Sequence, residues 1–161
     1  MALPLANVSG SSQAAGSRQP IHVMPVGPGG EYDAGYGSAD DYWSAHHLPA
    51  ANTQATITKA TAGAGIRNVC RSLTVILAAG ATAPTAVNLS VALIDGASGG
   101  TTYLWRATIS IPAVAGAVNG IAIPVWKPGT ANTAMTLEFS AAGGANTIES
   151  VSMDGTTISD D

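Results

Sequence analysis

The segment from Asp40 to His47, with the sequence DDYWSAHH, gathers carboxylates and imidazoles, which are side chains that bind transition metals. On an extended chain, however, the side chains of adjacent histidines point in opposite directions, and the remaining histidine, His22, is remote in sequence. We therefore expect no metal site and no cofactor here. Instead, we expect Tyr42 and Trp43 to pack this segment onto the domain that follows it.

The rest of the sequence does not gather the groups that hydrolytic catalysis needs. Glycoside hydrolysis requires two carboxylates that face one cleft, whereas Asp95, Glu138, Glu149 and Asp154 are scattered singly along the chain. No nucleophile is accompanied by a base and an orienting group, because all three histidines lie in the N-terminal region. The glycine-rich stretch 27–30 lacks the lysine and hydroxyl residues of a phosphate loop. We expect a protein that is not an enzyme.

The charge pattern excludes nucleic acid as a partner. The chain has six lysine and arginine residues against ten acidic ones, a formal net charge of −4, and no cluster of basic residues. Binding to a phosphate backbone depends on several basic residues acting together. We expect Arg71 and Arg106 to pair instead with Glu138 or Glu149 across a sheet.

Neither a disulfide nor a membrane segment is expected. The single cysteine, Cys70, lies within an apolar run, which predicts a small buried side chain. Every apolar run is much shorter than the length of about 18 residues that a membrane helix needs. The first ten residues, MALPLANVSG, lack the basic and apolar parts of a signal peptide. We therefore expect a protein that is made in the cytoplasm and does not associate with membranes.

The low content of charge points to subunit contacts. Charged residues make up only 10% of the chain, compared with about 25% in an ordinary soluble domain. Because interfaces are depleted in charged residues, we expect other subunits to cover much of the surface. A homo-oligomer such as a dimer or a trimer would provide this cover. The alternative is an alanine-rich domain that is soluble without partners.

Residues 1–50 differ in character from the rest of the chain. They are rich in proline and glycine and show no sustained apolar period, so they form neither a helix nor a central strand. We predict an extended N-terminal arm held by neighbouring subunits, for example by adding a strand to a sheet edge. The alternative is an arm folded back on its own domain. The candidate partner-binding residues are Ile21, Val23, Met24, Val26, Tyr32, Tyr36, Tyr42 and Trp43.

Residues 51–161 alternate between apolar and polar side chains in short runs separated by turn residues, most clearly over 87–93. Since no helix is indicated between these runs, they predict an all-β fold, an antiparallel β-sandwich resembling a jelly roll, with about seven or eight strands. The predicted strands are 53–59, 69–77, 87–93, 103–111, 118–126, 135–139 and 148–153. The predicted core consists of Leu73, Val75, Leu77, Leu89, Val91, Leu93, Trp105, Ile109, Leu137 and Phe139.

Two further features concern individual strands. Pro124 lacks the backbone donor of a central strand, so it predicts an edge strand or a bulge. Tyr103, Trp105 and Trp126 could form an exposed aromatic platform on which sugar rings stack. Because Trp105 alternates with core residues, we expect it to lie inside, and we expect Trp126 to be the more exposed residue.

Several stretches of the second region resemble, in the same order, a group of small structural proteins of tailed-bacteriophage virions. They are PAANTQATIT (49–58), GAGIRNVC (63–70), LIDGASGG (93–100) with LW (104–105), TAMTLEFSAA (133–142) and IESVS (148–152). The group is similar to capsid decoration (cement) proteins and to head or tail fibre-like proteins. The resemblance implies a role in assembly, without catalytic residues, and it does not extend to the arm.

The arm favours one position in such a virion. An arm that crosses several subunits makes several weak contacts at once, and together these give the tight binding that a cement protein requires. We therefore expect a capsid decoration protein that binds the major capsid protein on the outer surface of the head and stabilises the shell. The alternative is a tail, neck or fibre-associated protein whose sandwich binds a receptor or glycan. A fibre would more often show repeats or a coiled coil, and the sequence shows neither. Either protein would be made in the host cytoplasm.

Overall fold

The computed structural model describes residues 42–159, which form strands and loops. Its strands are β1 (Tyr42–His47), β2 (Thr56–Lys59), β3 (Ile66–Ala79), β4 (Val87–Asp95), β5 (Tyr103–Ile111), β6 (Val118–Pro128), β7 (Met135–Phe139) and β8 (Thr147–Ser159). The all-β prediction is therefore confirmed, with eight strands in the described part of the chain. Residues 42–159 contain no helix that is long and apolar enough to cross a membrane.

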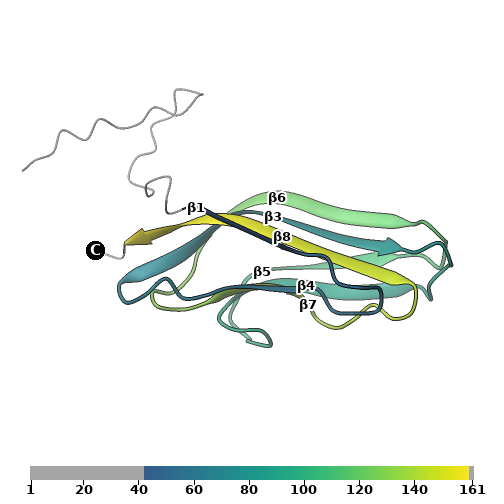
Figure 1. The fold of residues 1–161 in the computed structure, drawn as a ribbon, viewed down its shortest axis with the longest axis horizontal. Helices are drawn as coiled ribbons and strands as arrows, with labels where there is room; N and C mark the ends of the chain where they lie inside the picture. Colours follow the sequence, from purple (N-terminus) through teal and green to yellow (C-terminus); the bar gives the residue numbers. More distant parts are fainter. Residues whose placement is uncertain (1–41, 160–161) are drawn as a thin grey trace, which may run out of the picture. The chain divides into compact units, whose positions relative to one another are not determined.

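The strands form two antiparallel sheets that lie one above the other (Figure 1). One has the order β1-β8-β3-β6 and the other the order β2-β7-β4-β5. The pairs are nested, because β1 pairs with β8, β2 with β7, β3 with β6 and β4 with β5. The chain thus behaves as one long hairpin, with its tip at β4 and β5, that is rolled into two layers. This is a jelly-roll arrangement, as the sequence predicts.

The core lies between the two sheets and is mainly aliphatic. Alternate side chains of β3 point inward, so that Leu73, Val75 and Leu77 are almost fully buried. Of the ten predicted core residues, Leu89 and Trp105 are only partly buried at the margin of this cluster, whereas the other eight are buried. Trp105 lies on β5, an edge strand of its sheet, so it has a neighbouring strand on one side only.

The boundary predicted between residues 50 and 51 needs correction, because β1 belongs to the sandwich. Residues Tyr42 to His47 pair with β8 from Thr156 to Val151. The sequence YWSAHH does not indicate this strand, because it shows no clear apolar alternation. Only two of its side chains, Trp43 and the partly buried Ala45, pack against the core. Trp43 packs this segment onto the domain, as expected, whereas Tyr42, expected to do the same, is exposed.

Other strand limits also differ from the prediction. The last strand continues from 153 to Ser159, because these residues pair with the first half of β3, where Ile66 faces Ser159. The first predicted strand is shorter and begins at Thr56. The prediction for Pro124 is confirmed, since β6 is an edge strand and its register with β3 shifts next to this residue.

Trp43 lies directly over Gly155 on β8. A Cβ atom at position 155 would overlap with the carbonyl oxygen of Val69 and with the Trp43 indole. Backbone cannot move aside as a flexible side chain can. Only glycine therefore allows β1, β8 and β3 to lie together at this point.

We expect the Gly155→Ala substitution to lower the free energy of unfolding by about 3 kcal/mol or more, because the added methyl overpacks a site bounded by backbone. The matched control is Gly80→Ala, whose Cβ atom would meet only the carbonyl oxygen of Asn146, at 3.5 Å. The control should change stability by about 1 kcal/mol or less. Urea unfolding of both variants measures the difference. Equal stabilities would contradict this account of the Trp43 contact.

Cys70 is fully buried, as predicted. Burial, together with the nearby Asp154 carboxylate, raises the pKa of the Cys70 thiol to about 12. Since the thiolate is the reactive form, the folded protein should not react with a thiol reagent at about pH 8. Addition of denaturant should release one reactive thiol per chain. Rapid reaction of the native protein would show that the segment around Cys70 opens readily.

Candidate binding site

The candidate site begins with one residue that breaks the alternation of β4. Val91 and Leu93 point into the core, so Ala92 and Ile94 must lie on the outer face of the sheet. An outer face normally meets solvent, yet Ile94 is only 1% exposed. The loop between β4 and β5 folds back over this face, where it contacts Ile94 and Glu138.

The loop is shaped by its glycines. Gly96 and Gly99 have φ values of 144° and 78°, a region that side-chain-bearing residues rarely adopt. The Asp95 amide donates to the carbonyl of Thr102 at 2.8 Å and closes the base of the loop. Gly100 lies against Ile94, since a Cβ atom there would be 2.9 Å from the Ile94 Cγ2 atom. The glycine backbone thereby forms a lid over the apolar side chain.

Glu138 of β7 fixes the loop in place. Its Oε1 atom accepts a hydrogen bond from the Gly99 amide at 2.9 Å, and its Oε2 atom accepts one from the Ser98 hydroxyl. The carboxylate is buried in this position. A buried carboxylate is tolerated when hydrogen-bond donors satisfy it, so the loop and Glu138 stabilise one another.

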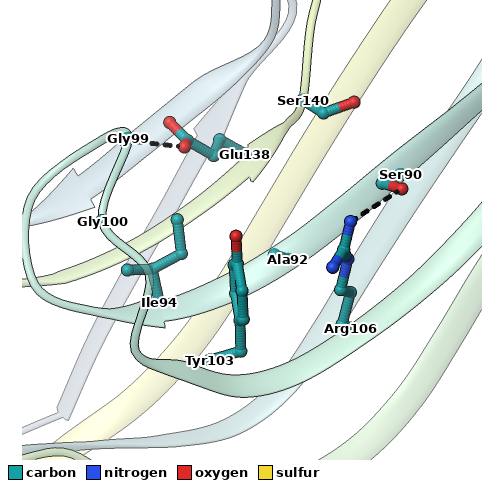
Figure 2. Close-up of a pocket in the computed structure, with 9 residues that line it drawn as sticks. All are labelled: Ser90, Ala92, Ile94, Gly99, Gly100, Tyr103, Arg106, Glu138 and Ser140. Carbon is teal, nitrogen blue, oxygen red and sulfur yellow. Dashed lines mark hydrogen bonds between the residues drawn. The ribbon is translucent and has the colours of Figure 1, made fainter.

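A pocket of about 170 Å³ lies beside this loop on the outer face of the sheet. Figure 2 shows its walls, with Tyr103 and Arg106 projecting from β5 and Glu138 reaching in from β7. Ser90 and Ala92 of β4 lie between them. The register of β4 and β5 shifts between Leu93 and Ile94, which puts Tyr103 and Arg106 on one face although they are three residues apart.

Arg106 is held in the pocket wall by two contacts. Its guanidinium carbon lies 5.1 Å from the centre of the Tyr103 ring, and its Nη2 atom donates to the Ser90 hydroxyl oxygen at 3.3 Å. The expected pairing of Arg71 or Arg106 with Glu138 or Glu149 is wrong. Each glutamate accepts hydrogen bonds from loop residues instead, and Arg71 stacks on Trp126.

The predicted aromatic platform does not form a single site. Of Tyr103, Trp105 and Trp126, only Tyr103 lines the pocket. Trp105 packs against the core but is only partly buried, although we expected it to lie inside. Trp126 is 49% exposed, as expected, but it belongs to β6 in the other sheet, where the Arg71 guanidinium lies 4.5 Å from its ring centre. Its φ of 46° is unusual for a residue with a side chain, and it lies where β3 and β6 shift register.

Sequence reasoning missed Ser90, Arg106 and Glu138 as members of one site. The available signal was Ile94, an apolar residue on the polar side of the β4 alternation, followed by a glycine-rich loop. An apolar side chain on an outer face requires a cover, and the loop provides it. The partner of the loop, Glu138, lies about 40 residues further along the chain, where no local pattern points to it.

The residues predicted for the arm fall into two groups. Ile21, Val23, Met24, Val26, Tyr32 and Tyr36 lie outside the described residues. Of the two that remain, Tyr42 is 51% exposed on β1, so a partner can reach it. Trp43 is 8% exposed and packs within its own chain, which assigns it to the anchoring role and not to partner binding.

His47, one of the two histidines of β1, has a structural use. The His47 Nδ1 atom accepts a hydrogen bond from the Thr56 amide at 3.1 Å, which ties β1 to the start of β2. Within residues 42–159, no group of three or more His, Cys, Asp or Glu side chains could hold a metal ion. Asp40 and Asp41, the two aspartates of the DDYWSAHH segment, lie outside this range.

A second buried carboxylate, Glu149 of β8, joins two loops. It accepts hydrogen bonds from the Ala55 amide at 2.8 Å and the Gly143 amide at 2.6 Å. Burial raises the pKa of the Glu149 carboxyl above its usual 4.5, against the opposing effect of the two amides.

The folded protein therefore holds the Glu149 proton to a higher pH than the unfolded chain does. The contribution of Glu149 to the free energy of unfolding should be greatest below pH 4.5 and should fall as pH rises through the raised folded pKa. The Glu149→Gln substitution removes this titration. Urea unfolding from acid to neutral pH should show a shallower fall for the variant than for the unaltered protein. Parallel curves would contradict the assignment.

Comparison with known proteins bears on the fold alone. No protein-family model matches the chain, and no curated protein sequence matches it. Among solved structures, a carbohydrate-binding module (CBM4) is similar, with 17% identity, a TM-score of 0.35, and coverage of 78% of this chain and 76% of that one. The coat protein of Tobacco streak virus has 5% identity and a TM-score of 0.33, with coverage of 74% and 89%. An arabinose-bound α-L-arabinofuranosidase (MgGH51) has 12% identity and a TM-score of 0.38, and the aligned region spans 76% of this chain and 24% of the arabinofuranosidase chain.

Proposed function

We propose that the protein is a non-catalytic structural component of a tailed-phage virion. In this proposal it is a decoration protein that binds the major capsid protein on the outer surface of the head through its N-terminal segment. The observation that carries the proposal is the attachment of that segment to the sandwich. β1 directly follows it, lies in a ladder with β8, and buries Trp43 in the core. A pulling force on the N-terminal segment would therefore be transmitted through β1 to the folded domain.

The residues of the phage resemblance support this proposal through their positions. The stretches 93–100 and 133–142 meet where Glu138 accepts from Ser98 and Gly99. The stretch 148–152 contains Glu149, which accepts from Ala55 in the stretch 49–58. The stretches of each of these two pairs are thus joined by hydrogen bonds to a buried carboxylate.

The surface of the sandwich supports contact with other subunits. Ile76 on β3 and Val118 on β6 lie on the outer face of their sheet. Ile76 is 37% exposed and Val118 is 68% exposed. Val114, in the loop that precedes β6, is 55% exposed. Single exposed apolar residues are ordinary, but here they accompany a charged content of only 10%. Such a surface is suited to an oligomer or to contact with a shell.

The proposal is tested with heads from a phage that lacks its decoration protein. Deletion of residues 1–41 should weaken binding to these heads on the order of 100-fold, because multivalent contacts are lost. The deletion must stop before Tyr42, since a chain that begins at residue 51 would also lose β1 and the Trp43 anchor. Cosedimentation measures binding, and electron microscopy of the bound heads shows the position of the density.

Thermal unfolding provides the control, because the deletion leaves every described strand intact. A shortened protein that unfolds at the same temperature and still decorates heads fully would overturn the role of the N-terminal segment. Density at the portal vertex or tail alone would favour the second candidate function. In that case the protein belongs to the neck, tail or fibre, and the pocket beside Tyr103 would contact a receptor or glycan of the host.

A further inference from the structure

We propose that the pocket on the outer face of β4 and β5 binds one neutral hexose unit of a glycan. This inference goes beyond the proposed function, because it holds wherever the protein lies in the virion. It depends on the chemistry of three side chains that the fold brings together from two strands: Tyr103 and Arg106 of β5, and Glu138 of β7.

Tyr103 supplies the apolar surface of the site. Its side chain is 47% exposed although it stands in a pocket wall, so part of the ring is accessible. A pyranose has a face of C–H groups, and an aromatic ring offers a flat apolar body with a polar tip at its edge. Figure 2 shows the Tyr103 side chain between Ile94 and Arg106, with its hydroxyl at the end away from β5.

The polar groups of the pocket match hydroxyls, which both donate and accept hydrogen bonds. Arg106 has only donors, five N–H groups, of which one contacts Ser90. Glu138 has only acceptors, and each of its oxygens has a second lone pair beyond the bonds from Gly99 and Ser98. Ser90 and Ser140 add hydroxyls of their own. A ligand that carries donors and acceptors together can satisfy both kinds of wall.

The charges indicate a neutral ligand. One guanidinium and one carboxylate line the pocket, so their charges balance. A sugar carboxylate that approached Arg106 would also meet the negative Glu138, and like charges in a partly desolvated site repel. A protonated amino sugar would meet the opposite conflict with Arg106. A neutral hexose avoids both conflicts.

The size and rigidity of the pocket set the length of glycan that it holds. Its volume of about 170 Å³ is below the roughly 300–1,000 Å³ of sites for drug-sized ligands, so one ring fits and the remaining units stay outside. The polar walls are already ordered, Glu138 by the loop amide of Gly99 and Arg106 by Ser90 and Tyr103. Ordered walls reduce the entropic cost of binding.

The test uses nuclear magnetic resonance on the full-length, isotope-labelled protein, with methyl glucoside, methyl galactoside and methyl mannoside as probes. At least one of these hexosides should shift the amide signals of Gly99 and Gly100, with a dissociation constant on the order of 1 mM. The Tyr103→Ala substitution should weaken this binding at least tenfold, whereas Tyr103→Phe should keep most of it.

The matched control is Trp126→Ala. Like Tyr103, Trp126 is half exposed and has an arginine over its ring, but it lies in the other sheet and does not line the pocket. This variant should bind the hexosides as the unaltered protein does. Equal loss of binding in both variants would show non-specific contact with aromatic residues and would overturn the proposal.

Two other outcomes would overturn it. One is the absence of any shift at Gly99 and Gly100 with all three hexosides at concentrations well above millimolar. The other is tighter binding of methyl glucuronide than of methyl glucoside, which would show that Arg106 selects an anion. Because the isolated protein is used, these outcomes are independent of whether the protein decorates phage heads.

Discussion

The position of β8 between β1 and β3 is the constraint on which the rest of the sandwich depends. β8 pairs with β1 over Tyr42–His47 and with β3 from Ile66 to Ala79, so it joins the first strand to the centre of the sheet. Gly155 makes this approach possible, because the Trp43 ring occupies the space that a side chain would fill. The burial of Trp43 and the attachment of β1 to the sandwich depend on this contact.

Two buried carboxylates complete the fold where strand pairing ends. Glu138 binds the loop between β4 and β5, and Glu149 binds the amides of Ala55 and Gly143. Each replaces hydrogen bonds that a loop cannot make with a neighbouring strand. The two differ in consequence, because Glu149 is closed off from solvent at 1% exposure, whereas Glu138 lines the pocket. One carboxylate therefore serves only the fold, and the other also offers acceptors to a ligand.

The class of fold could be predicted from the alternation of apolar residues, since Leu73, Val75 and Leu77 or Val91 and Leu93 can face a common core only from strands. Pro124 also indicated an edge strand. β1 escaped detection because its place depends on Trp43 meeting Gly155, residues far apart in the chain. The pocket escaped for the same reason. Its shape is set by tertiary hydrogen bonds to Glu138, and a sequence pattern reports only on neighbours along the chain.

The nesting of the strands also has a consequence for the synthesis of the protein. β1 is made before β8 during synthesis. Because β1 pairs with β8, it can join the sheet only after β8 has also been made. Pairing between the two ends of a chain is slow compared with local pairing. A nascent or truncated chain that lacks β8 cannot fix its first strand to a folded body. The complete sandwich therefore forms only after β8 has been made.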